Sequence, residues 1–227
     1  MEGTLRKPMN VKKVVQRTLL YFVVVWICLF ILYPYFVMVC TALKSRAEIF
    51  SIDGTILPIN ALWSNFIEVW TLAPMAQYMF NSLLVAGGST LIAIICGIPA
   101  AYALSRMKFK GKTAFLGFII VSQMFAPVVL LIGIYKILAA FSMTDSRWGL
   151  IFIFINAWNE YTVALCLIST DTIKPLTVGI NIFNGYNIIE WQYLFAGSIF
   201  AIIPVVIMFM SIEKHLVSGL TSGGVKG

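Results

Sequence analysis

The sequence is poor in charged residues, which make up 11% of its 227 positions. Soluble domains typically carry about 25% charged residues, so this composition excludes an ordinary soluble domain. Hydrophobic residues account for 60% of the chain instead, and the connections between the apolar runs are short. The chain is therefore predicted to be a membrane protein, and an ATPase or a soluble binding domain would have to come from another chain.

Residues that carry catalysis or bind metals are also scarce. His215 is the one histidine, and the four cysteines have neither metal-ligand spacing nor companion histidines. The pair Gly87-Gly88 lacks the following Lys-Ser/Thr of a phosphate-binding loop. We therefore expect no catalytic residue, no metal site and no enzyme activity in this chain.

Long apolar runs are abundant, and each is long enough for the roughly 20 residues that cross a bilayer as a helix. An all-α polytopic transmembrane helix bundle is predicted, with about five spans. We place a cytoplasmic N-terminal tail at 1–18, a transmembrane domain at 19–212 and a C-terminal tail at 213–227. The predicted spans lie at about 19–43, 80–104, 115–139, 148–170 and 191–212.

Basic residues are concentrated next to certain spans, as the positive-inside rule requires of cytoplasmic segments. One cluster precedes the first span, and a second fills the connection 105–113, whereas 44–79 contains only Lys44 and Arg46 as basic residues. The N-terminus and the 105–113 connection are therefore predicted to be cytoplasmic. Membrane topology explains these clusters better than nucleic-acid binding does, so no nucleic-acid partner is expected.

The predicted topology contains a conflict of parity. Five crossings from a cytoplasmic N-terminus place the C-terminus outside, although Lys214, His215 and Lys226 suit the cytoplasmic side. Three explanations remain open: the run 148–170 does not cross, the tail is external, or a span present in relatives is missing from this chain.

The acidic residue Glu160 lies within a predicted span, which makes it a candidate for function because intramembrane charges are costly. At helical spacing Asn156, Asn159 and Glu160 share one face. This face could hydrogen-bond to a neighbouring helix or line a polar pathway, and both interpretations remain open.

Five strings occur in order along the chain: TALKSRAEIF after the first span, Asn81–Leu83, Pro99–Lys112, Ala157–Tyr161 and the terminal GLTSGGVKG. Together they resemble the permease subunits of binding-protein-dependent carbohydrate ABC importers of the maltose-transporter type. The family is expected to have six core spans and, between the fourth and fifth, a cytoplasmic loop that docks into the ATPase. Most of the fourth span and this loop have no counterpart here, which would explain the conflict of parity.

The resemblance implies an inner-membrane, multi-pass permease of an ATP-driven carbohydrate importer that forms part of the sugar pathway. The implied partners are a second permease subunit, two ATP-binding subunits, an extracytoplasmic sugar-binding protein and membrane lipid. ATP would be used by the partner subunits, so no cofactor is expected here. The alternative is an internally deleted, transport-incompetent variant, or an assembly or sensor subunit that acts through helix contacts.

Three groups of residues are candidates for these roles. The substrate pathway would use Asn156, Trp158, Asn159 and Glu160. Contact with the binding protein would use Asn184, Gly185, Tyr186 and Asn187 in the polar loop 171–190. The ATPase side would use Gly219, Thr221, Gly223 and Gly224 in the C-terminal tail.

Overall fold

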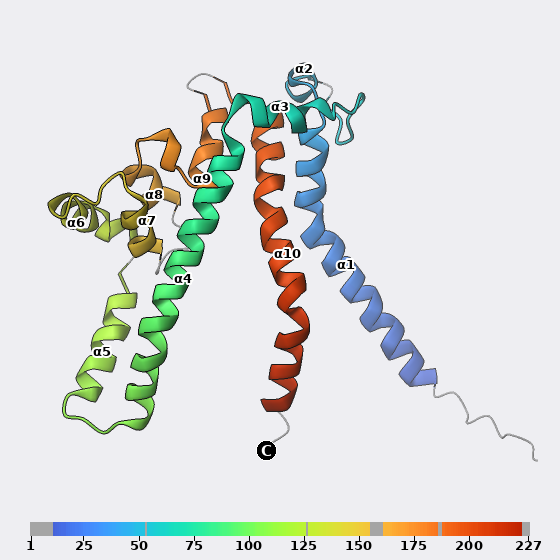
Figure 1. Cartoon of the computed structure of the whole chain (residues 1–227). Coiled ribbons are helices and arrows are strands. Elements are labelled where there is room, and N and C mark those ends of the chain that lie inside the picture. Colours follow the sequence, from blue (N-terminus) through green and yellow to red (C-terminus); the bar gives the residue numbers. More distant parts are fainter. Residues whose placement is uncertain (1–10, 53, 126, 155–160, 186–187, 224–227) are drawn as a thin grey trace, which may run out of the picture.

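The computed structural model describes residues 11–52, 54–125, 127–154, 161–185 and 188–223 (Figure 1). Within these ranges the regular structure is helical, apart from one isolated bridge between Asn184 and Ile189. The predicted all-α polytopic helix bundle is therefore confirmed.

Three helices are long and apolar enough to cross a membrane: α1 (Val11–Ala42), α4 (Met75–Arg106) and α10 (Trp191–Gly223). Thirty-two residues of α-helix extend for about 48 Å, well over the roughly 30 Å of a hydrocarbon core. Each helix contains one internal proline, Pro34, Pro99 and Pro204 respectively, without ending there. The predicted spans 80–104 and 191–212 lie within α4 and α10, and the predicted span 19–43 ends one residue beyond α1.

The two remaining apolar runs are divided into shorter helices. The run 115–139 forms α5 (Lys112–Gln123) and α6 (Pro127–Ala140), and 148–170 contains α7 (Arg147–Phe154) and α8 (Tyr161–Leu167). Pro127 has no backbone N–H to donate, which suits the first position of a new helix. Together these segments carry the chain from the lower end of the bundle back to its upper part (Figure 1).

Short helices gather at the end of the bundle where α1 ends and where α4 and α10 begin (Figure 1). This end holds the segments that follow α1 and those that precede α10. They are α2 (Arg46–Ile49), α3 (Ser64–Leu72), the 3-10 helix η1 (Asp171–Ile173), α9 (Leu176–Gly179) and the 3-10 helix η2 (Ile180–Phe183).

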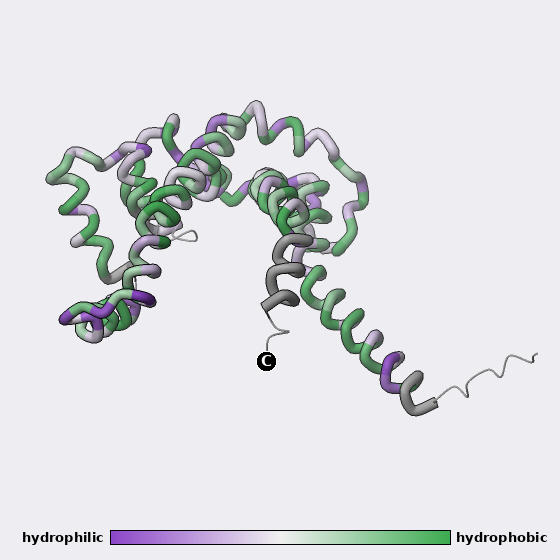
Figure 2. Tube along the Cα trace, turned by 60° about the horizontal axis from the view of Figure 1, so that its bottom comes forward, coloured by the Kyte–Doolittle hydropathy of each residue, from purple (hydrophilic) through white to green (hydrophobic). Residues whose placement is uncertain are grey.

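The opposite end holds the start of α1, the turn between α4 and α5 and the end of α10 (Figure 1). Figure 2 shows hydrophilic residues at that turn and near the start of α1, with apolar stretches along the helices between the two ends. Both described ends of the chain thus lie on one side, together with the basic connection 105–113. This arrangement agrees with the charge distribution. It requires the chain to cross the membrane an even number of times between these two ends.

The buried core is confined to the half of the bundle near the short helices. One cluster is built around Met75 and Tyr78 of α4 with Val69 of α3, and a second joins Val85 of α4 to Leu150 of α7. Elsewhere the long helices are uncovered: the apolar window of α1 is 0% buried. Such broad apolar exposure is what a lipid-facing or subunit-facing surface requires.

Candidate functional site

An open groove of about 730 Å³ lies at the short-helix end of the bundle. One wall comes from Ser45 and Arg46 at the start of α2 and from Asn65 and Glu68 of α3, and the other from residues 182–193 around the start of α10. The groove therefore brings together two segments that are more than 100 residues apart in the chain.

Local hydrogen bonds fix the first wall. Ser45 caps α2 by accepting a hydrogen bond from the backbone N–H of Glu48 at 3.2 Å. The buried Asn65 side chain donates to the carbonyl oxygens of Ala42 at 2.8 Å and Lys44 at 3.0 Å. Because the last carbonyls of a helix have no partner within it, Asn65 both satisfies the end of α1 and holds α3 against it.

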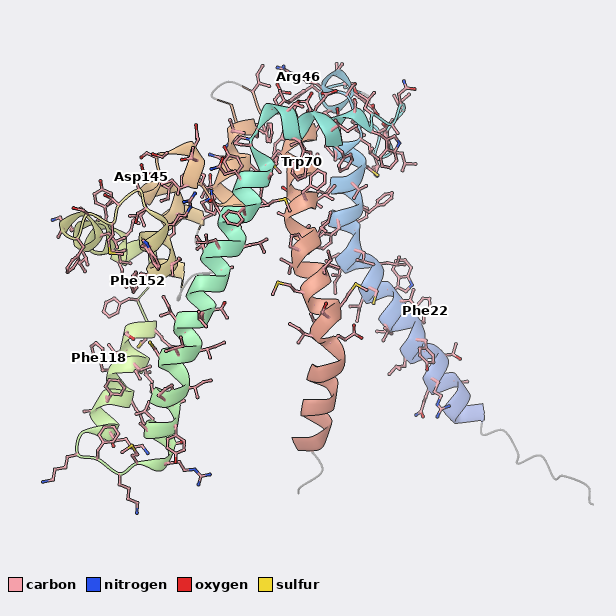
Figure 3. All side chains as sticks on the ribbon, in the orientation of Figure 1. Phe22, Arg46, Trp70, Phe118, Asp145 and Phe152 are labelled. Carbon is pink, nitrogen blue, oxygen red and sulfur yellow. The ribbon has the colours of Figure 1, made fainter. Side chains whose placement is uncertain are left out.

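Polar contacts connect the two walls. Arg46 Nη1 lies 2.9 Å from Glu190 Oε1, and Gln192 Nε2 donates to Glu190 Oε2 at 2.7 Å. The Tyr193 hydroxyl donates to Glu68 Oε2 at 2.5 Å, which joins α10 to α3. Figure 3 shows Arg46 at this end of the molecule. The groove is thus bordered by charged groups that are mostly engaged with one another.

Gln192 is the exception within this network. Its side chain is 4% exposed, and its Oε1 atom has no hydrogen-bond partner among the described residues. A buried acceptor without a partner costs about 1–3 kcal/mol. The start of α10 therefore holds a polar group that another arrangement of the groove could satisfy better.

Aromatic packing joins α3 to α10 just below the groove. The ring of Trp70 meets that of Phe200 edge-on with centroids 5.0 Å apart, and Phe66 meets the same ring at 6.0 Å. Edge-to-face pairs of this kind contribute about 0.5–1.5 kcal/mol beyond the area that they bury. The first turns of α10 are therefore held firmly against α3.

A second polar centre forms around Asn81 of α4, which is fully buried. Its Nδ2 donates to the carbonyls of Thr172 at 2.9 Å and Lys174 at 3.1 Å, and its Oδ1 accepts from Arg147 Nε at 3.2 Å. The neighbouring Ser82 hydroxyl accepts from the N–H of Leu176 at 2.7 Å. One turn of α4 thereby positions α7, η1 and α9.

A second groove, of about 660 Å³, opens between α4 and α10 at the depth of the membrane span. Its lining is largely apolar, with hydroxyl groups from Ser82, Thr90, Tyr161 and Thr177. Gly87 contributes to the α4 side, and a Cβ atom added there would meet nothing within 4 Å. Tyr161, which lines this groove, directly follows the predicted pathway residue Glu160 in the sequence.

The predicted site residues fall in different parts of the chain. Gly185 lines the first groove, and the Asn184 side chain nearby donates to Asn181 Oδ1 at 3.3 Å. Gly219, Thr221 and Gly223 belong to the last turns of α10, at the opposite end. Outside the described residues lie Asn156, Trp158, Asn159, Glu160, Tyr186, Asn187 and Gly224.

The candidate site residues predicted from the sequence do not include four polar residues of the first groove, Arg46, Glu68, Glu190 and Gln192. A usable signal was present for Arg46, Glu190 and Gln192, because these charged or polar side chains lie within three residues of the ends of predicted spans. What the sequence could not indicate is that the two segments meet. Among the described residues, no three His, Cys, Asp or Glu side chains lie close enough together to hold a metal ion.

Comparison with known proteins shows a consistent set of relatives. The inner membrane ABC transporter permease protein YcjP of Escherichia coli is 27% identical, over 86% of this chain and 91% of that protein. The sulfoquinovosyl glycerol transport system permease protein SmoH of Agrobacterium fabrum is 26% identical, over 86% and 89%. The trehalose/maltose transport system permease protein MalG of Thermococcus litoralis is 23% identical, over 95% and 99%. No protein-family model matches the chain.

These alignments have more positions than the number of residues that this chain contributes to them. The alignment with YcjP runs over 256 positions, whereas 86% of 227 residues is about 195. The surplus of roughly 60 positions leaves room for one span of about 20 residues and an adjoining loop. The aligned part of the relative is therefore longer than that of this chain by an amount that accommodates the missing span and loop implied by the resemblance.

The fold agrees with this relationship. A solved bacterial ABC transporter involved in the import of the acidic polysaccharide alginate matches with a TM-score of 0.64 at 18% identity, over 94% of this chain and 99% of that one. The architecture is thus shared even where the sequences differ. The chain is a homologue of the permease subunits of carbohydrate ABC transporters.

Proposed function

We propose that this chain works as a membrane-spanning permease subunit of an ATP-driven carbohydrate importer and forms part of its sugar pathway. The observation that carries this proposal is homology over most of the chain with permeases named for carbohydrate uptake, among them SmoH and MalG. The three long apolar helices supply the membrane-spanning frame that such a subunit needs.

The remaining components would come from other chains. The sequence has no phosphate-binding loop, so ATP would be bound and hydrolysed by two ATP-binding subunits, and this chain would need no cofactor of its own. The apolar surfaces that α1 and α10 leave exposed fit a second permease subunit and membrane lipid. An extracytoplasmic sugar-binding protein would deliver the sugar.

The groove at the short-helix end is the proposed contact surface for the binding protein. It lies at the end opposite the basic turn, which places it outside if that turn is cytoplasmic. Charged rims of this kind favour recognition and association rate more than raw affinity. The loop residues Asn184, Gly185, Tyr186 and Asn187 would contribute to the same surface.

The sugar pathway is proposed for the region where the α4–α10 groove meets the segment before Tyr161. In that segment Asn156, Trp158, Asn159 and Glu160 supply the polar and aromatic groups that a sugar needs, whereas the described walls are mainly apolar. Hydroxyl groups from Ser82 and Thr90 add hydrogen-bonding capacity along α4. The second permease subunit would complete the enclosure.

A single helix could transmit the state of one end to the other. Helix α10 starts at the groove, where Tyr193 contacts Glu68 of the opposite wall, and continues to Gly223. The tail residues Gly219, Thr221, Gly223 and Gly224 would lie on the ATPase side. Because a rigid helix can shift as a unit, closure of the ATPases would change the groove that the binding protein contacts.

We also propose an alternative to the importer. If the missing stretch carried the loop that docks into the ATPase, this chain would be an internally deleted, transport-incompetent permease, or an assembly or sensor subunit that acts through helix contacts. Such a chain would still insert and associate through α1, α4 and α10 but would not couple ATP hydrolysis to transport.

Reconstitution distinguishes these functions. The chain, its second permease and the ATP-binding subunits are placed in proteoliposomes, and ATP hydrolysis is measured with and without sugar-loaded binding protein. We expect the loaded binding protein to stimulate hydrolysis several-fold, and a matched preparation without this chain to show no stimulation. If the ATP-binding subunits do not co-purify with the chain at all, the importer function is contradicted and the alternative stands.

A further inference from the structure

The turn between α4 and α5 holds four basic side chains without a partner. Arg106 ends α4 and Lys112 begins α5, with Lys108 and Lys110 between them. Arg106, Lys108 and Lys110 are exposed, and Lys112 is partly exposed. The hydrogen bonds and ion pairs of the described residues involve none of these four side chains, and the sequence has no acidic residue between Glu68 and Asp145.

The geometry of the turn keeps these charges close to the membrane boundary. Only five residues separate the two helices, and Gly111 reverses the chain with a φ of 92°, which glycine adopts without steric cost. The apolar, exposed part of α4 from Leu91 to Tyr102 leads directly to Arg106. The basic groups therefore cannot extend far beyond the depth of the lipid phosphates.

Apolar side chains alternate with the basic ones. Met107 is 56% exposed on extended backbone, and Phe109 is 46% exposed. Successive side chains of an extended segment point to opposite sides. The apolar set can therefore enter the acyl boundary while the basic set meets the headgroups. This pattern suits a lipid interface better than a purely aqueous loop.

No other described element covers the turn. Figure 1 shows it at the tip of the α4–α5 hairpin, apart from α10 and α1, and Figure 3 shows nitrogen-tipped side chains that extend away from it. The positive-inside rule explains which side of the membrane the turn occupies, but it names no ligand for the charges. Four basic residues beside a membrane span are typical of anionic lipid binding.

We propose that the α4–α5 turn is a binding site for anionic phospholipids, in which Arg106, Lys108, Lys110 and Lys112 bind the headgroup phosphodiester while Met107 and Phe109 contact the acyl boundary. This site lies outside the proposed sugar pathway and needs none of the transport partners. Its test is therefore independent of the proposed function.

Native mass spectrometry of the purified full-length chain in detergent tests the proposal. The chain is titrated with phosphatidylglycerol and, separately, with phosphatidylcholine of the same acyl composition. We expect phosphatidylglycerol to bind at least tenfold more tightly. Equal affinity for the two lipids would overturn the proposal, as would displacement of phosphatidylglycerol by millimolar inorganic phosphate, because the ligand would then be a free anion.

Variants locate the site. Each lysine near a membrane surface raises the affinity for anionic lipid by a factor of roughly five. The triple variant Lys108→Gln/Lys110→Gln/Lys112→Gln should therefore lose the preference for phosphatidylglycerol. The triple variant with arginine at these positions should keep it. Lys110→Gln alone should weaken binding about fivefold, whereas Lys136→Gln, which removes an exposed charge from α6, should change it less than twofold.

The detergent setting matters for the interpretation. Removing basic residues can alter the orientation of a chain in a bilayer, but a micelle has no inside or outside, so an altered topology cannot cause the loss. Retention of the preference by the triple glutamine variant, or an equal loss in Lys136→Gln, would overturn the assignment to this turn.

Discussion

The guanidinium of Arg46 and the carboxylate of Glu190 lie 2.9 Å apart, and they join the start of α2 to the residue that precedes α10. Both side chains are partly exposed, at 48% and 28%. Exposed ion pairs contribute about 0–1 kcal/mol to stability, so this contact matters more for the shape of the groove than for folding.

Reversing the charge of Glu190 should therefore impair function without unfolding the protein. In Glu190→Arg two guanidinium groups repel across the groove, and we expect stimulation of ATP hydrolysis by the binding protein to fall several-fold while the unfolding temperature changes little. The double variant Arg46→Glu/Glu190→Arg should recover part of the stimulation. Asp171→Asn, which breaks the ion pair with Lys174 outside the groove, is the matched control. Equal stimulation in all four proteins would contradict a role for the groove.

Loss of the Asn81 amide should destabilise the fold. Asn81→Ala removes three hydrogen bonds of a fully buried amide, two to the carbonyls of Thr172 and Lys174 and one from Arg147, at a cost of about 1–3 kcal/mol. Thermal unfolding in detergent measures the change, and Asn184→Ala serves as an exposed control that should stay within about 0.5 kcal/mol of the original protein. Similar unfolding temperatures for the two variants would show that the polar centre around Asn81 is not structural.

Gly179 should not tolerate a side chain. A Cβ atom there would collide with the ring of Tyr78, which is 1% exposed and cannot move into free space. We expect Gly179→Ala to destabilise the protein by about 1–3 kcal/mol, as overpacked cores do. Gly87→Ala is the control, because a Cβ at that position meets nothing within 4 Å. If thermal unfolding shows the same temperature for both variants, α9 does not pack on α4 as described.

The connection before α7 should loosen in acid. The hydroxyl of Thr170 donates to Asp145, and this bond, with the backbone N–H groups of Thr170 and Ser169, holds the pKa of Asp145 below its ordinary value. A lowered pKa means that Asp145 stabilises the fold above its unfolded pKa and that this contribution is lost as the pH falls through the folded pKa. The difference in unfolding temperature between the original protein and Asp145→Asn should therefore be present at pH 7 and shrink under strongly acidic conditions. A difference that stays constant with pH would contradict the assignment.

The sequence was sufficient for the class of fold and for the three long helices, because hydropathy and length determine which segments can cross a bilayer. The division of 115–139 and 148–170 was not predicted. Pro127 is visible in the sequence, but whether a proline bends a membrane helix or begins a new one depends on its neighbours. Pro34, Pro99 and Pro204 all lie inside continuous helices.

The groove could not be predicted for a different reason. Arg46 and Glu190 are 144 positions apart, and a single sequence contains no information about which loops of a bundle meet. Gly185, which lines the groove, was singled out because turn residues in a polar loop are a local signal, and its contact with the binding protein stays a prediction. The role of Asn81 depends on carbonyls that only the fold brings near. The candidate pathway residues Asn156, Trp158, Asn159 and Glu160 remain predictions.

In the proposed topology, the start of α1, the end of α10 and the basic turn share one side of the membrane, opposite the groove that would receive the binding protein. Single cysteines placed by Lys110→Cys, Ile188→Cys and Gly227→Cys, in a background without the four native cysteines, test this with a membrane-impermeant maleimide on intact cells. The account predicts labelling at 188 from outside, and labelling at 110 and 227 only after permeabilisation. Labelling of position 227 from outside, together with 188, would contradict it.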